Sequence, residues 1–251
     1  MTTLMQDLRY AIRMLLKNPG FAVVAIIALA LGIGANAAIF SVVNTVLLRS
    51  LPYNDPDRLM VVRENKLPQF PEFSCSPGNF LDWQKQNTSF EKMVAVNGTA
   101  FNMVSGDAEP ERLRAARVSA GLFEMLGVAP SIGRTFTDEE DQPGHPVVLL
   151  SSSLWNRRFS ADPNIVGQSI TLSASSYTII GVMPPSFQFP DGDTELWAPI
   201  AFTAQQAQAH GSHYLSVIGR LKPGVSRDQA ETELDGIAAQ LAEQYPNSNA
   251  N

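Results

Sequence analysis

The sequence predicts an α+β protein with one N-terminal transmembrane helix, followed by a two-part α/β domain outside the cytoplasm. The stretch between Lys17 and Arg49 holds no Asp, Glu, Lys, Arg or His, and it is longer than the roughly 20 apolar residues that cross a bilayer core. The later chain alternates strand-like and helix-like apolar runs, separated by Pro and Gly. We therefore expect a cytoplasmic amphipathic helix at 1–18, a transmembrane helix and its extension at 20–48, and an outer domain at 50–251 with a smaller inserted subdomain at about 121–200.

The first segment has the pattern of a helix that lies flat on a membrane surface. Arg9, Arg13 and Lys17 recur every four residues on one face, and the other face carries Leu4, Leu8, Ala11, Ile12 and Leu15. Asn18-Pro19-Gly20 should end this helix, because Pro disfavours helical geometry in the residue before it. An ordinary soluble amphipathic helix is the alternative.

The apolar stretch is expected to span the membrane from Phe21 to about Asn44. Cations before a first span stay in the cytoplasm, so the main domain should lie outside. A cleaved signal peptide is the alternative, because Ala35-Asn36-Ala37 resembles a cleavage site. The apolar pattern continues to Leu48, which favours an uncleaved span.

Small residues inside the span predict contact with another membrane helix. Pairs four residues apart include Ala28 with Gly32 and Gly34 with Ala38. Gly32-x-Gly34-x-x-Ala37 also matches a dinucleotide-binding fingerprint, but that motif needs a strand, a turn and a helix in a soluble sheet. We therefore expect helix contact and no nucleotide site.

Composition limits the partners of the outer domain. The chain has a net charge of −6 with 18 basic and 24 acidic residues; the first 48 residues hold three basic and one acidic, which leaves 15 and 23, or −8. Nucleic acid is an unsuitable partner, because its binding requires a basic surface. Cys75 is the single cysteine, so no disulfide can form within the chain.

The first part of the outer domain should begin with a strand at 59–62 and a short helix at 77–83. Residues 93–97 and 100–104 look like a strand pair separated by Gly98-Thr99. A third strand follows near Leu113, where Arg112 and Arg114 suggest a charged edge that deters further pairing.

The second part mixes short helices and strands. We expect a helix at 122–126, a strand at 146–150 followed by a helix that a serine of Ser151–Ser153 caps, a hairpin at 169–182, a return segment at 197–200 and a strand at 215–221. Ser226 and Gln229 form a capping box for the last helix, which Leu234, Ile237 and Leu241 should dock and Pro246 should end.

The search for catalytic, cofactor and metal sites is negative. The sequence contains no P-loop motif and no G-x-S-x-G motif. His210 and His213 flank a Gly-Ser pair without a third His or Cys nearby, and the acidic run Asp138–Asp141 lacks calcium-loop spacing. We therefore predict a protein that is not an enzyme and has no cofactor.

The chain resembles a known family along nearly its whole length. It is similar to the N-terminal part of MacB/FtsX-type ABC transporter permeases, within the group described as acidobacterial duplicated permeases. The matching segments are DLRYAIRMLLKNPGFAVVAIIALALGIGANAAIFSVVNTVLLRSLPY, GNFLDWQKQNTSFEKM, VSAGLFEMLGVAPSIGRTFTDEED, VVLLSSSLWNRRFSADPNIVGQSITL, YTIIGVMPPSFQFP and RLKPGVSRDQAETELDGIAAQLAEQYP.

The resemblance implies a MacB-like periplasmic core domain on a single-pass helix in the bacterial inner membrane, with the N-terminus inside. It implies an ABC-type ATPase subunit and other permease helices as partners, with a homodimer and a periplasmic adaptor as further ones, and a role in efflux or mechanotransmission. The family continues into further membrane helices and an FtsX-like region, whereas this sequence stops at Asn251. A static membrane-anchored interaction module without transport activity is therefore the alternative function.

Overall fold

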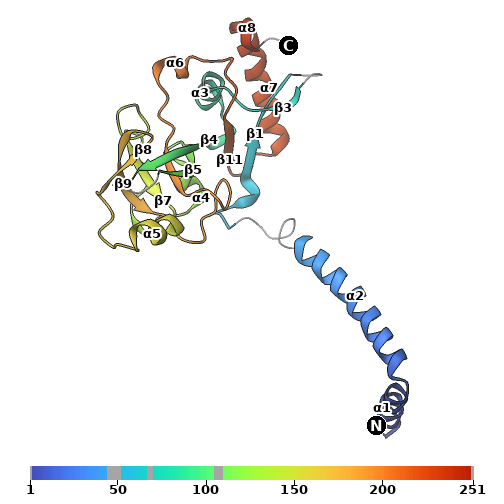
Figure 1. Ribbon diagram of the computed structural model, residues 1–251. Helices are drawn as coiled ribbons and strands as arrows, with labels where there is room; N and C mark the ends of the chain where they lie inside the picture. The colour runs from blue at the N-terminus through green and yellow to red at the C-terminus, as the bar shows by residue number, and fades with distance from the viewer. Residues whose placement is uncertain (1, 44–51, 67–69, 105–109, 250–251) are drawn as a thin grey trace. The chain divides into compact units, whose positions relative to one another are not determined.

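A computed structural model describes residues 2–43, 52–66, 70–104 and 110–249 of the chain (Figure 1). The chain divides into two compact units, Met1–Pro52 and Tyr53–Asn251, which are considered separately. The first unit contains helix α1, Thr2–Lys17, and helix α2, Pro19–Val43. Residues 44–48 of the predicted span lie outside the described part of the chain. We call the second unit the sheet domain.

The sheet domain is built on a mixed sheet of nine strands in its described residues. The strand order is β1-β11-β4-β5-β10-β7-β9-β6, and β8 pairs with both β4 and β9. The strands are β1 Leu59–Val62, β4 Phe90–Val104, β5 Glu111–Val118, β6 Ile132–Gly133, β7 Val147–Leu150, β8 Ser169–Leu172, β9 Ser175–Val182, β10 Leu196–Pro199 and β11 Ser216–Leu221. A separate two-stranded sheet joins β2, Glu64–Lys66, to β3, Phe70–Phe73.

Short helices connect these strands, and one long helix follows them. They are η2 Pro56–Arg58, α3 Pro77–Gln86, α4 Leu122–Leu126, α5 Ser152–Phe159, α6 Ala204–Ala207, α7 Arg227–Gln244 and α8 Pro246–Asn249. The caps predicted from the sequence form: Ser151 accepts from the Leu154 amide at 3.1 Å, and Ser226 with Gln229 makes a complete capping box at the start of α7.

Six of the strands close into a ring. The far end of β4 pairs with β8, with Met103 opposite Leu172, and the ring then runs through β9, β7, β10 and β5 back to β4. Each of the six strands contributes to one buried cluster, which includes Phe101, Leu113, Leu150, Leu172, Ile179 and Leu196. Alternate residues of a strand point to the same face, so this cluster fills the inside of the ring. We call this part the strand ring.

The first half of β4 belongs to a different layer. Together with β1 and β11 it is covered by α3 and α7, which lie beside these strands in Figure 1. The shared cluster includes Phe80, Trp83, Met93, Val217, Ile237 and Leu241, and Leu234 packs against it. The predicted docking face of the last helix is thus confirmed. The opposite face of β4, with Val94 and Val96, packs against α4 and Trp197.

Two strand predictions are wrong. Residues 93–97 and 100–104 form one continuous strand, because Gly98 stays extended and pairs with Ala116 of β5 instead of turning the chain. The predicted edge at β5 is wrong for Ala115–Val118, which lies between β4 and β10. Arg112 and Arg114 pair with β4 and share one face of the strand, because alternate residues point the same way.

The boundaries of the smaller subdomain at about 121–200 stay a prediction. The strand ring includes β5 and half of β4, which come before residue 121.

Candidate functional site

Helix α2 has the length and composition of a membrane span. It holds no charged residue, and Pro19–Ser41, 23 residues, is apolar and long enough to cross a membrane. At about 1.5 Å per residue this segment measures about 35 Å, against about 30 Å for a bilayer core. Phe21 and Leu31 are exposed by 71% and 68% on different sides of the helix. A helix that is apolar all round needs lipid or other helices around it.

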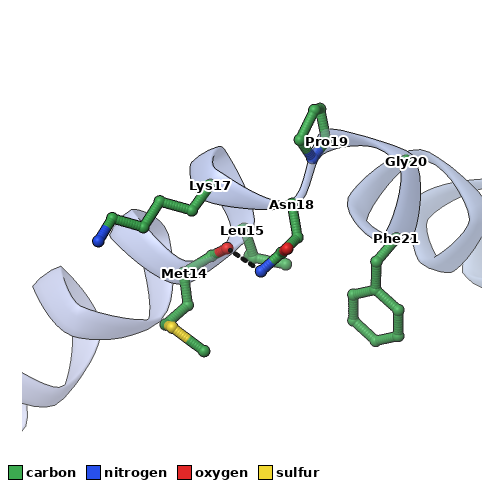
Figure 2. Close-up of a pocket in the computed structure, with 7 residues that line it drawn as sticks. All are labelled: Met14, Leu15, Lys17, Asn18, Pro19, Gly20 and Phe21. Atoms are coloured by element: carbon green, nitrogen blue, oxygen red, sulfur yellow. Dashed lines mark hydrogen bonds between the residues drawn. The ribbon is translucent and has the colours of Figure 1, made fainter.

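A short elbow joins α1 to α2 (Figure 2). The amide side chain of Asn18 donates to the Met14 carbonyl at 3.3 Å, and its backbone N–H donates to the Leu15 carbonyl at 3.2 Å. The Asn18 carbonyl in turn accepts from the Ala22 amide at 3.0 Å. Asn18 therefore ends one helix and begins the next, with Pro19 at the first helical position that proline favours. A hollow of about 640 Å³ lies in this elbow.

The small residues predicted to contact another helix lie on two sides of α2. Ala28 and Gly32 form one pair and Gly34 and Ala38 the other, and at 100° per residue the pairs are about 120° apart around the axis. A Cβ atom added at Gly32 or Gly34 would meet nothing within 4 Å. The Asn36 side chain donates to the Gly32 carbonyl at 2.9 Å, so its amide is partly satisfied within the helix. Helix contact at these residues stays a prediction.

The dinucleotide fingerprint is excluded by its setting. Gly32, Gly34 and Ala37 lie inside one continuous helix that follows another helix, whereas the motif requires a strand and a turn before it.

The segment that enters the sheet domain is held by a buried arginine. Arg220 of β11 is 5% exposed. Its guanidinium donates to the carbonyls of Asp55 at 3.1 Å, Asn54 at 2.5 Å and Met125. A buried charge is costly unless it is hydrogen-bonded, and here three carbonyl groups satisfy it. We call Asn54, Asp55, Met125 and Arg220 the entry clamp.

Neighbouring residues reinforce the entry clamp. The Asn54 amide donates to the Leu126 carbonyl at 3.1 Å, and Arg58 donates to the Leu221 carbonyl at 2.9 Å. Gly127 has a φ of 72°, and a Cβ there would lie 2.2 Å from the Asn54 side chain. Glycine is therefore required where α4 passes the entry segment. Asn54 and Asp55, near the start of the sheet domain, are thus fixed to β11 and α4.

The two histidines singled out in the sequence have structural contacts. His210 Nε2 lies 2.9 Å from Asp82 Oδ2, and its ring stacks on Tyr245 at 3.6 Å between centroids. His213 Nε2 lies 3.0 Å from Glu64 Oε2. Within the described residues, no group of three or more His, Cys, Asp or Glu side chains is placed to hold a metal ion. The pair therefore connects α3, β2 and the C-terminal helices.

The acidic run at 138–141 also has a structural explanation. Asp141 accepts from the Ala201 amide at 2.9 Å and from the Ala120 amide at 3.1 Å, so it ties together two loops at strand ends. Burial raises the pKa of Asp141, and these amide bonds oppose that rise. Glu140 makes two 2.7 Å bonds to Arg134, which lower the pKa of Glu140.

Sequence reasoning missed Arg220. The signal was present, because Arg220 is the one charged residue in the predicted strand at 215–221. A charged residue in such a strand lies either on a solvated face or in the core with hydrogen-bond acceptors. The acceptors of Arg220 are backbone carbonyls 95 to 166 residues away in the sequence, so no local pattern reveals them.

These features define a class: a protein with a bilayer-length helix and a separate mixed α/β domain that follows it. The chain belongs to the family of the MacB-like periplasmic core domain, whose family model matches residues 22–237. A comparison with curated proteins finds no significant match. The family prediction made from the sequence is confirmed.

Solved structures share the fold of the chain. A domain of a protein described as a permease, from Porphyromonas gingivalis, is 18% identical with a TM-score of 0.59, over 78% of this chain and 87% of that one. The periplasmic region of MacB from Actinobacillus actinomycetemcomitans is 15% identical with a TM-score of 0.58, over 82% and 91%. The extracellular domain of the noncanonic ABC-type transporter YknZ from Gram-positive bacteria is 16% identical with a TM-score of 0.53, over 76% and 95%.

Proposed function

We propose that the chain is a non-catalytic membrane component of an ABC-type transporter of the MacB/FtsX permease kind, with a role in efflux or mechanotransmission. One observation carries the proposal: a MacB-like periplasmic core domain family match extends over an apolar helix long enough to cross a bilayer. In this role α2 anchors the sheet domain, which works as a moving or binding part and carries out no reaction.

The proposed location is the bacterial inner membrane. Arg9, Arg13 and Lys17 precede α2, and positive charge before a first span favours the cytoplasm. The N-terminus then lies inside and the sheet domain outside. Membership in the acidobacterial duplicated group stays a prediction from the resemblance.

The proposed partners are an ABC-type ATPase subunit and other permease helices, with a second copy and a periplasmic adaptor as further ones. The two small-residue pairs of α2 support helix partners, because close approach needs small side chains. The entry clamp supports transmission, because the chain that leaves the membrane helix is fixed to β11 and α4 as soon as the sheet domain begins.

The proposal is tested by expressing the full chain in a bacterium with reporters fused after Asn251. A phosphatase fusion that is active and a fluorescent-protein fusion that is dark would place the sheet domain outside, and blotting checks that the chain is uncleaved. The solubilised protein is then purified and bound proteins are identified. Recovery of an ABC-type ATPase or permease supports the transport role.

A double variant, Gly32→Leu with Gly34→Leu, keeps α2 apolar but prevents the close approach of another helix. This variant should insert normally and recover less of the helical partner. A cytoplasmic sheet domain, or a chain that recovers no ABC component, would refute the transport role; a stable monomer alone would favour the static membrane-anchored module.

A further inference from the structure

Helix α1 presents a row of three cations to solvent. Arg9, Arg13 and Lys17 are exposed, and their spacing of four residues places them along one face. In the part of the chain that the structure describes, no carboxylate lies within ion-pair distance of these three side chains. The positive charge of this face is therefore available to an external anion.

The same helix also exposes apolar side chains. Met5, Leu15 and Leu16 are exposed by 75%, 45% and 77%. An apolar strip beside a cationic strip is the pattern of a helix that lies in the membrane interface, where long basic side chains reach outward to the headgroups. A folded protein core does not cover the described part of this surface.

The elbow places this surface at the end of the membrane span. One residue, Asn18, separates α1 from α2, and its bonds to Met14, Leu15 and Ala22 join the two helices. Since Pro19–Ser41 is long enough to cross the bilayer core, the C-terminal end of α1 lies where the headgroups of one leaflet begin. Lys17 lines the elbow (Figure 2). Arg13 and Arg9 follow about one and two helical turns away.

We propose that α1 binds the anionic phospholipid headgroups of the leaflet at the N-terminal end of α2, through Arg9, Arg13 and Lys17. Charge complementarity selects this occupant, because a cation near an anionic leaflet gains roughly fivefold in binding and three cations gain about a hundredfold. The inference depends on the membrane placement of α2 and not on transport, so it survives if no ATPase partner is found.

The test uses the full chain in lipid vesicles. A nitroxide is attached at Leu16→Cys, where Cys75 does not compete because it is buried. Collision of the label with oxygen and with a water-soluble nickel chelate gives the ratio of membrane-docked to undocked α1. This ratio is compared between phosphatidylcholine vesicles and vesicles with one quarter phosphatidylglycerol, at low and high salt.

We expect the docked-to-undocked ratio to rise at least tenfold with phosphatidylglycerol and to fall toward the phosphatidylcholine value in 0.5 M salt, where screening is strong. The variant Arg9→Gln, Arg13→Gln, Lys17→Gln should lose the lipid preference, and Lys17→Gln alone should lose about fivefold. A control with Arg112→Gln and Arg114→Gln, exposed on the sheet domain, should keep it. Vesicle flotation confirms that every variant is inserted.

An equal ratio in both lipids would overturn the proposal, and so would a triple variant that keeps the preference. Docking that appears only when an ATPase subunit is added would assign the cationic row to a protein partner instead. Each of these results leaves the co-purification test of the transport role unaffected.

Discussion

Arg220 shows how one side chain can fix the route of a whole segment. Its guanidinium reaches the carbonyls of Asn54, Asp55 and Met125, so three parts of the sheet domain meet at a single group. Backbone carbonyls satisfy its charge without requiring a buried carboxylate, although Asp55 Oδ2 lies 4.0 Å away.

Arg220→Met should lower the free energy of unfolding by about 3 kcal/mol, because three carbonyls lose their donor in a buried site. For a domain of this size the loss corresponds to a fall in Tm of roughly 6–12 °C. Thermal unfolding of the detergent-solubilised chain measures it. Arg114→Met, an exposed control, should change Tm by about 1 °C or less. Equal shifts for the two variants would contradict a stabilising role of the entry clamp.

Glu233 fastens the long helix α7 to the start of β4. Its carboxylate accepts from the Thr88 amide at 2.7 Å, the Thr88 hydroxyl at 2.5 Å and the Ser89 amide at 2.9 Å. Burial alone would raise the pKa of Glu233, but these hydrogen bonds outweigh it, and the net pKa is lower than its ordinary 4.5.

A lowered carboxylate pKa adds stability above the unfolded-state pKa and loses it as the pH falls through the folded-state pKa. Glu233→Gln should therefore cost about 1–2 kcal/mol at pH 7 and less below pH 4. Urea unfolding at several pH values measures the difference. Glu231→Gln, an exposed change on the same helix, should cost little at any pH; a Glu233→Gln cost that is constant down to pH 3 would contradict the assignment.

At the scale of elements, the sequence predicts what depends on local chemistry. The capping serines and the apolar face of α7 are local patterns, and the structure confirms them. The wrong predictions concern partners distant in the chain. A glycine between two apolar runs often marks a turn, whereas Gly98 here pairs with Ala116 inside a continuous strand. The parallel pairing of β10 with β5 joins residues about 80 apart, which no local pattern reports.

Of the candidate site, the membrane span was predicted from the sequence and the entry clamp was not. The sequence shows the span and its small residues directly, because a helix in lipid requires a long stretch of apolar residues without charges. The entry clamp depends on backbone groups brought together by the tertiary fold, and only the structure shows it.

Helix α2 offers a direct test of its small residues. Gly34→Leu adds a large side chain on one side of the helix, where a Cβ now meets open space, and should weaken a dimer at least fivefold in detergent if that side is in contact. Analytical ultracentrifugation measures the association. Gly32→Leu tests the other side, and Leu31→Ile serves as a control that keeps the side-chain volume. A dimer unchanged by both glycine substitutions would remove helix contact from the proposed function.

At the scale of the whole molecule, Cys75 reports the integrity of the sheet domain. The side chain is fully buried beside β11, and burial raises the pKa of the Cys75 thiol well above its ordinary value. The neutral, covered thiol is a poor nucleophile. Native protein should therefore react with a maleimide at least a hundredfold more slowly than unfolded protein, measured by mass spectrometry. Fast labelling of native protein would show that this region opens locally.

Strand β4 has a consequence for how the protein acquires its native state. Its 15 residues serve both the layer under α7 and the strand ring, and β5 pairs along it from Val118 to Glu111. Either half alone would leave part of β4 without its partner strands. The two halves should therefore form and melt in a single cooperative transition, and the chain should stay sensitive to proteases until α7 has packed.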